Sequence, residues 1–167
     1  GGIIAVEKDT KRISSLEDNL KSLGIGSVEI KNADINSLKD TDMGKFDKIL
    51  VDAPCSSIGV IRKNPDIKYK HTAADLLINR TRQAGLLKSA SGFLAETGRL
   101  VYSVCSTEPE EGEQVVMEFL KSATDFRIIE DVQAEFLRPF MEKGKFRTYP
   151  HKHNMDGFFG VALCRNR

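Results

Sequence analysis

The sequence predicts an α/β fold in which short apolar strands alternate with amphipathic helices. Short apolar runs end at polar side chains, apolar residues recur at helical spacing between these runs, and glycines separate the segments. This alternation predicts a mostly parallel sheet with helices on both faces, joined by right-handed crossover connections. With 167 residues, of which 40% are hydrophobic, the chain fits one domain, which we place over residues 1–167.

The first third of the chain contains three predicted strands and one long helix. Each strand is a short apolar run that ends at or near an acidic side chain, and the helix carries its apolar residues on one side. Gly24 and Gly26 end the helix. The predicted strands cover residues 3–6, 28–34 and 46–52, and the predicted helix covers residues 8–23.

The remainder of the chain predicts two further helices and three strands. A long helix lies between Thr72 and Ala95, and Gly98 opens a strand over residues 99–104. Pro109 begins the next helix. Four acidic residues fall in its first turns, where the helix dipole favours negative charge, namely Glu108, Glu110, Glu111 and Glu113. The last two strands cover residues 126–129 and 158–164.

Composition argues against several classes of protein. No apolar run is long enough to span a membrane, and the first residues lack the features of a signal peptide, which favours a cytoplasmic protein. The three cysteines are too few for a disulfide framework and form no CxxC pair, and Cys164 lies inside an apolar strand. His151 and His153 have no third ligand nearby, so we predict no metal site.

The net charge of +1 conceals two basic segments, because residues 61–100 and 137–167 each have a net charge of +5. Such segments favour a polyanionic partner, although an ordinary solvated surface is the alternative. The loop over residues 59–71 opens the first segment, and His151 lies in the second. The loop side chains that we expect to contact RNA are Arg62, Lys63 and Lys68 for phosphates and Tyr69 for a stacked base.

Polar residues that follow strands are candidate ligand contacts, because ligands of open α/β sheets bind at the carboxyl ends of the strands. Glu7 ends the first strand, where a carboxylate can accept hydrogen bonds from a ribose diol. Asp34 follows the second strand and could lie near an adenine amino group. A turn or capping role before Ser37 is the alternative for Asp34.

Two cysteines also follow predicted strands. Cys55 lies three residues after Asp52, in a segment where Pro54 restricts the backbone and Gly59 permits a tight loop. Cys105 follows the strand at residues 99–104. If the two strands are parallel neighbours, about 4.8 Å apart, both thiols face the same crevice.

Two thiols and a carboxylate suit substitution at carbon 5 of a pyrimidine. A thiolate that adds to carbon 6 converts the ring into an enamine that can attack a methyl donor. The Asp52 carboxyl group can hydrogen-bond or protonate the ring nitrogen, and a second thiol can assist release after carbon 5 loses its proton. The positions alone leave open which thiol attacks, because neither has an adjacent histidine.

These segments resemble the Sun-type family of RNA (cytosine-5)-methyltransferases, which use S-adenosylmethionine on a Rossmann-like class I methyltransferase fold. The resemblance extends from Ile3 to the C-terminus. It implies an enzyme that methylates transfer or ribosomal RNA, and it does not specify an oligomeric state. The motifs that carry it are residues 52–59 with Arg62 and residues 65–68, residues 102–106, and Pro150 and His151 with residues 156–159.

The resemblance also implies a role for each candidate residue. Cys105 would be the nucleophile, Cys55 would aid release of the product, and Asp52 would hold the target ring. Glu7 and Asp34 would bind the ribose and adenine ends of the cofactor. Pro54, together with Asp52, would line the cofactor site.

The chain departs from the family pattern at two positions and at its start. Val104 replaces the usual threonine, and Gly112 replaces the usual asparagine. The family's first strand and Gly-rich cofactor loop would precede Gly1, so we expect an N-terminally truncated catalytic domain with a gap between the strands at residues 3–7 and 48–52. The alternatives are an exocyclic-amine nucleic-acid methyltransferase, which needs no thiol, and a non-catalytic RNA-binding module.

Overall fold

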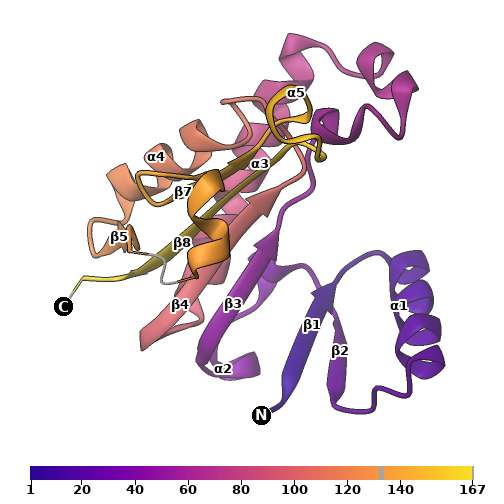
Figure 1. Cartoon of the computed structure of the whole chain (residues 1–167). Helices are drawn as coiled ribbons and strands as arrows, with labels where there is room; N and C mark the ends of the chain where they lie inside the picture. Colours follow the sequence, from indigo (N-terminus) through magenta and orange to yellow (C-terminus); the bar gives the residue numbers. More distant parts are fainter. Residues whose placement is uncertain (132–133, 167) are drawn as a thin grey trace. The chain divides into compact units, whose positions relative to one another are not determined.

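The computed structural model describes residues 1–131 and 134–166 and divides the chain into two compact units (Figure 1). The first unit is Gly1–Gly44 and the second is Lys45–Arg167. None of the described helices combines the length and the apolar character that crossing a membrane requires. Each unit is described separately below.

The first unit is a parallel pair of strands with a connecting helix. Strand β1 (Ile3–Glu7) pairs with β2 (Val28–Asn32), and helix α1 (Thr10–Ser22) joins them. Helix α1 begins two residues later than predicted, because the Asp9 side chain accepts a hydrogen bond from the Lys11 backbone N–H and caps the helix. A 3₁₀ turn, η1 (Ile35–Ser37), and a short helix, α2 (Asp40–Met43), complete the unit.

The second unit contains a mixed sheet of six strands. Strand β3 (Phe46–Asp52) is parallel to β4 (Leu94–Val104), whereas β8 (Phe158–Arg165) is antiparallel to β4. The prediction of a mostly parallel sheet is therefore wrong for this unit, because β8 runs opposite to β4 and the pairings beyond β3–β4 are antiparallel in the described part of the chain. The remaining strands, all in antiparallel pairs, are β7 (Lys145–Thr148), β6 (Met141–Glu142) and β5 (Phe126–Ile128).

Two long helices, α3 (Ala73–Gly92) and α4 (Glu113–Ser122), contribute buried residues to the same core as the sheet (Figure 1). Alternation along β4 explains this arrangement, because Leu100, Tyr102 and Val104 are buried, whereas Arg99 and Val101 are exposed. The predicted helices on both faces are thus not seen within this unit, where both long helices of the described part pack on the buried face of β4.

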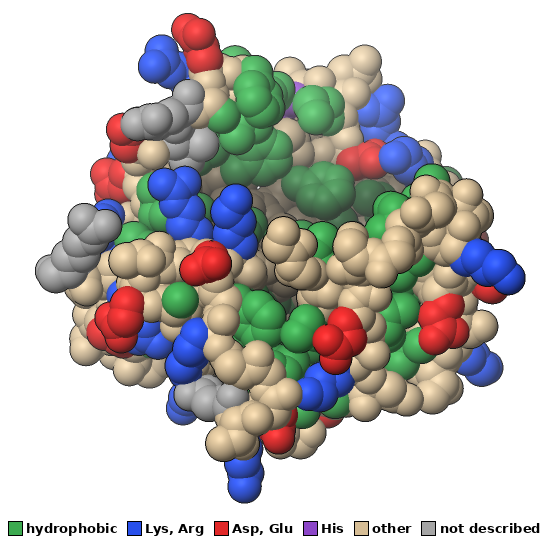
Figure 2. Space-filling model, turned by 90° about the horizontal axis from the view of Figure 1, so that it is seen from below, with side chains coloured by type: hydrophobic (Ala, Val, Ile, Leu, Met, Phe, Trp, Pro, Cys, Tyr) green, Lys and Arg blue, Asp and Glu red, His purple; other side chains and the backbone are tan. Residues whose placement is uncertain are grey.

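The opposite face of the sheet carries exposed apolar side chains. Leu50 of β3 is 69% exposed, and its partner in the β4 register, Val101, is 36% exposed. Hydrophobic side chains also reach the surface between charged groups of both signs on the face drawn in Figure 2.

The largest differences from the predictions occur at three element boundaries. Helix α3 ends at Gly92 rather than Ala95, and β4 begins at Leu94, because Leu94 is 1% exposed and pairs with Phe46. Helix α4 begins at Glu113, since residues 109–112 form turns before it. The sequence did not predict several short elements, namely α2, β6, β7, α5 (Pro150–His153), η1, η2 (Ile58–Val60), η3 (Pro65–Tyr69) and η4 (Glu135–Phe140).

The strands on either side of the predicted gap belong to different sheets. Among the described residues, β1 pairs with β2 and β3 pairs with β4, and no pairing joins β1 to β3. Direct pairing of β1 with β3 would have overturned the predicted placement of a missing strand. That missing strand, and with it the truncated domain, stays a prediction.

Candidate active site

The two cysteines predicted to share a crevice lie at the ends of parallel neighbouring strands. In the β3–β4 register, Asp52 pairs with Ser103, and the Ala53 N–H donates to the Ser103 carbonyl at 2.9 Å. This pairing brings the Cys55 and Cys105 Sγ atoms to 3.4 Å from each other. The two thiols thus form a hydrogen-bonded pair. Solvent still reaches them, because both side chains are only partly buried.

The thiol pair has an asymmetric electrostatic environment. A hydrogen bond with the Cys55 thiol lowers the pKa of Cys105 to about 6, and the Ser57 hydroxyl, 3.4 Å from Cys105 Sγ, contributes in the same direction. The same contact with Cys105, together with burial, raises the pKa of Cys55 well above its ordinary value. These opposite directions favour a Cys105 thiolate that accepts a hydrogen bond from the Cys55 thiol.

The residues just before Cys55 connect the thiol pair to the sheet and to α3. Asp52 is exposed, and the Ser103 hydroxyl donates to its Oδ1 atom at 3.2 Å. The Pro54 carbonyl accepts a hydrogen bond of 2.9 Å from Gln83 Nε2 of α3. Asp52 and Pro54 therefore lie on the same strand end as Cys55, as the sequence motif predicted, and the Asp52 carboxyl group has a partly solvated position.

A buried acid lies behind the thiols. Glu111 is 0% exposed, and its carboxyl group accepts hydrogen bonds from Ser56, the residue that follows Cys55. The prediction that Glu111 lies in the first turns of a helix is wrong, because residues 109–112 form turns before α4 and the Glu111 carboxyl group is buried. Acids also occur at positions 108, 110 and 113, so the sequence pattern gives no signal that singles out Glu111.

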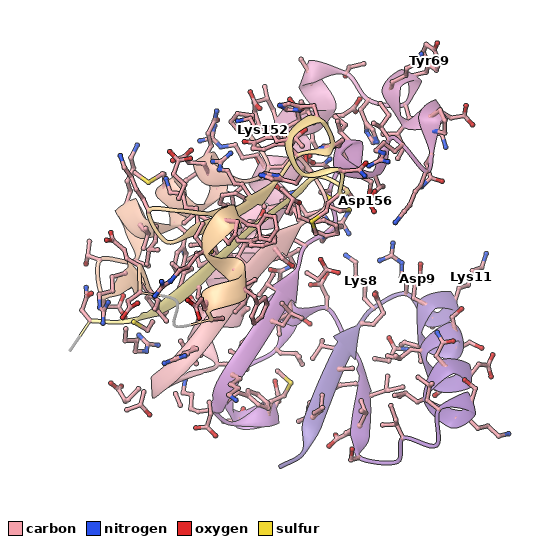
Figure 3. All side chains as sticks on the ribbon, viewed as in Figure 1. Lys8, Asp9, Lys11, Tyr69, Lys152 and Asp156 are labelled. Atoms are coloured by element: carbon pink, nitrogen blue, oxygen red, sulfur yellow. The ribbon has the colours of Figure 1, made fainter. Side chains whose placement is uncertain are left out.

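The loop that follows Cys55 is held against the segment before β8. The Gly59 N–H donates to the Cys105 carbonyl at 3.1 Å, and the Gly157 N–H donates to the Gly59 carbonyl at 2.8 Å. Lys63 Nζ lies 2.5 Å from Asp156 Oδ2, so one of the expected phosphate contacts is already paired with a carboxylate. Figure 3 labels Asp156 within this unit.

Further along this loop, the aromatic and basic side chains lie at the surface. Tyr69 is 79% exposed, and Lys68 Nζ lies 4.6 Å from the centre of its ring (Figure 3). Arg62 is also exposed. An exposed ring with an adjacent cation suits the stacking of an unpaired base.

The two histidines of helix α5 have different environments. His153 Nδ1 accepts a hydrogen bond of 2.9 Å from the Tyr149 backbone N–H, and its ring stacks on the Tyr149 ring. His151 is exposed, 5.5 Å from the Tyr149 ring, and Lys152 Nζ lies 5.1 Å above the same ring (Figure 3). Within residues 1–131 and 134–166, no group of three histidine, cysteine or acidic side chains is arranged to hold a metal ion.

The first unit carries the two carboxylates expected to bind the cofactor. Glu7 Oε1 accepts backbone hydrogen bonds from Lys8 at 2.8 Å and Asp9 at 2.9 Å, while Arg12 Nη1 lies 3.7 Å from its Oε2 atom (Figure 3). These contacts fix the Glu7 carboxylate at the carboxyl end of β1. Its side chain remains 28% exposed, so a ligand can reach it.

Asp34 follows β2 and has a capping role in this structure. Its Oδ1 atom accepts a hydrogen bond from the Asn36 backbone N–H at 3.0 Å, and Lys8 Nζ lies 3.0 Å from its Oδ2 atom. These two contacts, led by the backbone N–H, lower the pKa of Asp34 below its ordinary value. The structure therefore shows the capping role that the sequence left open as the alternative for Asp34, and its contact with a cofactor stays a prediction.

Comparison with known proteins identifies relatives over nearly the whole chain. A ribosomal RNA small subunit methyltransferase B from Klebsiella pneumoniae is 41% identical over 167 residues, which cover 99% of this chain and 37% of the relative. A solved structure described as PH0851 has a TM-score of 0.90 at 32% identity and covers 99% of this chain and 37% of its own. The structure of NSun6 from Pyrococcus horikoshii with SFG has a TM-score of 0.83 at 32% identity, and the match covers 100% of this chain and 42% of the NSun6 chain.

These matches confirm the resemblance and the fold class expected from the sequence, although the chain spans only 37% of the curated relative that it matches at 41% identity. The fold is the α/β fold with a mixed sheet found in Sun-type and other class I S-adenosylmethionine-dependent methyltransferases. The family model for the 16S rRNA methyltransferase RsmB/F matches residues 1–164, and the chain accordingly belongs to the RsmB/F, or Sun-type, methyltransferase family.

Proposed function

We propose that the protein carrying this chain methylates carbon 5 of cytosine in RNA with S-adenosylmethionine, through a covalent adduct between Cys105 and carbon 6 of the base. The observation that carries the proposal is the 3.4 Å contact between the Cys55 and Cys105 thiols at the ends of two parallel strands. Membership of a family described as rRNA methyltransferases supports RNA as the substrate.

Cys105 is the nucleophile in this proposal because its environment favours the thiolate. Its sulfur adds to carbon 6, and the electron pair of the C5–C6 double bond moves to carbon 5, which becomes nucleophilic. When bound, S-adenosylmethionine would supply the electrophilic methyl group, whose bond to the sulfonium sulfur would break as the bond to carbon 5 forms, leaving S-adenosylhomocysteine. Loss of the carbon 5 proton to a base then expels the Cys105 thiolate and restores the aromatic ring.

Two neighbouring groups assist these steps. The Asp52 carboxyl group lies at the same strand end and is exposed, and in its protonated form it can donate a hydrogen bond to the ring nitrogen as negative charge develops there. The Cys55 thiol, which keeps its proton at neutral pH, stabilises the Cys105 thiolate when the thiolate leaves. Loss of Cys55 would therefore slow release of the Cys105 thiolate.

The first unit is proposed to bind the nucleoside part of the cofactor. Glu7 fits a ribose, because backbone hydrogen bonds hold Oε1 while the partly exposed carboxylate can still accept from hydroxyl groups. Lys8 Nζ occupies Asp34 Oδ2, so an adenine amino group binds Asp34 only when this lysine turns away. Asp52 and Pro54, which were also expected to line the cofactor site, lie beside Cys55 in the second unit.

We propose that the loop after Cys55 and helix α5 contact the RNA. Tyr69 offers an exposed ring for base stacking, and Arg62, Lys68 and His151 offer polar groups at the surface. Lys63 contributes only if it exchanges Asp156 for a phosphate. The target cytosine must be unpaired or flipped out, because the thiol cannot reach carbon 6 within a base-paired stack.

Trapping with RNA that contains 5-fluorocytosine tests the proposal. The longest natural protein that carries this chain is incubated with this RNA and S-adenosylmethionine, and denaturing electrophoresis detects the covalent adduct. We expect an adduct that Cys105→Ser abolishes and Cys55→Ser retains, because fluorine at carbon 5 cannot leave as a proton would. Methylated RNA without an adduct in any background would favour exocyclic-amine chemistry. RNA binding without cofactor binding would favour a non-catalytic module.

A further inference from the structure

The carboxyl group of Glu111 accepts hydrogen bonds from two segments, the loop that contains Cys55 and helix α3. Ser56 contributes two of them, from its backbone N–H to Oε1 at 2.7 Å and from its hydroxyl to Oε2 at 2.5 Å. Asn79 of α3 donates to Oε1 at 2.9 Å, and Gln83 of α3 donates to the same atom at 3.4 Å. A single buried group therefore joins the residue after Cys55 to helix α3.

The same network reaches the residue after Cys105. The hydroxyl groups of Ser56 and Ser106 lie 3.5 Å apart, and both side chains are buried. Ser106 Oγ in turn accepts the Glu108 N–H at 3.2 Å, at the start of the turn that carries Glu111. The network therefore connects the loop that carries Cys55 to the loop that carries Cys105.

Glu111 occupies this position without a neutralising cation. The ion pairs found among residues 1–131 and 134–166 include none to Glu111, and its four hydrogen bonds come from neutral donors. The Tyr102 hydroxyl also donates to the Glu111 carbonyl at 2.6 Å, which fixes the backbone. Placing an acid in a fully buried site is unfavourable unless every hydrogen bond is satisfied, so the site is built around this side chain.

We propose that Glu111 is a positioning residue, whose buried carboxyl group fixes the Ser56 loop so that the Cys55 thiol stays within hydrogen-bond distance of Cys105 Sγ. This role deepens the proposed function and rests on it for its catalytic meaning. Without Glu111, the Ser56 N–H and hydroxyl lose their acceptors, the loop relaxes, and the Cys105 thiolate loses its donor. Glu111 does not contact the reacting atoms in this account.

The ionisation of Cys105 in this chain, measured without RNA or cofactor, tests the proposal. Alkylation of Cys105 by iodoacetamide is followed between pH 4 and 10 by mass spectrometry of the peptide that contains it. We expect Glu111→Ala to raise the midpoint pH, and a rise of one unit from about 6 lowers the alkylation rate by about twofold at pH 7 and by nearly tenfold at about pH 5. Glu111→Gln should restore most of the wild-type midpoint, because an amide can accept from the Ser56 N–H and donate to its hydroxyl.

Two further variants keep the test decisive. Ser56→Ala removes only the hydroxyl link and should raise the midpoint by less than Glu111→Ala, so it serves if Glu111→Ala does not fold. Glu110→Ala removes the adjacent acid, which has no part in the network, and should leave the midpoint unchanged. A wild-type midpoint in folded Glu111→Ala, or in Ser56→Ala if the former is unfolded, would overturn the proposal even if thermal stability falls.

The outcome is separable from that of the proposed function. A raised midpoint in Glu111→Ala together with no RNA adduct in the wild-type enzyme would retain the positioning role and reject the cytosine reaction. An RNA adduct in the wild-type enzyme together with an unchanged midpoint pH in Glu111→Ala would support the cytosine reaction and reject the positioning role.

Discussion

Cys55 and Cys105 illustrate how the surroundings of a side chain, rather than its type, set its chemistry. Both cysteines follow a strand and both are partly buried, so their positions in sequence do not distinguish them. The structure does, because hydrogen-bond contacts with the Cys55 and Ser57 side chains lower the pKa of Cys105, whereas the contact with Cys105, together with burial, raises the pKa of Cys55. The nucleophile implied by the family resemblance is thus also the one favoured by local electrostatics.

The first prediction concerns the dependence of Cys105 on its neighbour. Cys55→Ala removes the donor that contributes most to lowering the pKa of Cys105, so the midpoint pH of Cys105 alkylation should rise from about 6 toward the ordinary value of a thiol. Because only the thiolate reacts, alkylation at pH 7 should slow by about tenfold for a pKa that ends near 8. Cys164→Ala is the matched control. Faster alkylation of Cys55 than of Cys105 in the wild-type chain would contradict the assignment.

The second prediction concerns the close contact between the loop after Cys55 and the segment before β8. A Cβ atom at Gly59 would lie 2.0 Å from the Gly157 carbonyl oxygen and 2.9 Å from the Cys105 carbonyl oxygen. Gly59→Ala therefore forces the backbone at residue 59 away from the backbone at Gly157 and Cys105. We expect the free energy of unfolding to fall by more than about 2 kcal/mol in urea titrations. Gly92→Ala, where nothing lies within 4 Å, should be neutral or stabilising. Equal effects of the two substitutions would show that the loop is not held as described.

At the scale of elements, the long periodic segments were predictable and the short ones were not. The apolar runs of β1, β3 and β8 and the helical repeats of α1 and α3 are strong local signals. Strand β7 has no such signal, because it depends on pairing with β8 rather than on its own pattern. Helix α4 begins later than Pro109 indicated, since the inward carboxyl group of Glu111 draws the preceding residues into turns.

The third prediction concerns the start of helix α3. The Thr72 side chain accepts the Asp75 N–H, and the Asp75 carboxylate accepts the Thr72 N–H at 2.7 Å, which together form a capping box. Thr72→Ala should lower the free energy of unfolding by about 1 kcal/mol in urea titrations. Thr72→Ser, which keeps the hydroxyl, should lose much less. If both substitutions cost the same, the cap does not stabilise the helix.

The Asp75 carboxylate adds a pH dependence to this cap. Hydrogen bonds from the Thr72 backbone and side chain lower the pKa of Asp75 below its ordinary value of 3.8. The contribution is therefore complete above pH 3.8 and is lost as the pH falls through the lower pKa of the folded state. Asp75→Asn should remove this acid-dependent part, which a comparison of urea titrations at pH 6 and pH 3 would measure.

At the scale of the whole molecule, the sequence predicted the thiol pair more completely than its supporting residues. Cys55, Cys105 and Asp52 follow strands, where the topology of a parallel pair brings them together. Glu111 could not be found in this way, because its role depends on burial and on donors from α3, far away in sequence. One domain was expected rather than two compact units, although the gap predicted between the strands at residues 3–7 and 48–52 agrees with the absence of a described pairing between β1 and β3.

The fourth prediction concerns the proposed ribose contact in the first unit. In calorimetric titrations of the longest natural protein that carries this chain, S-adenosylmethionine should bind, and Glu7→Ala should weaken binding by at least about tenfold, since a charged hydrogen-bond partner of the ribose is lost. Lys11→Ala, which changes an exposed side chain near the start of α1, is the control. Unchanged affinity in Glu7→Ala would remove this residue from the cofactor site.

The central claim is that Cys105 attacks carbon 6 so that the methyl group reaches carbon 5. The most direct test is the release of tritium from RNA that carries [5-³H]cytosine, because methylation at carbon 5 must expel the hydrogen isotope there. We predict that the longest natural form of the protein releases tritium in equal amount to the methyl groups transferred, and that Cys105→Ser abolishes both. Methyl transfer without tritium release would contradict the account and place the methyl group elsewhere on the base.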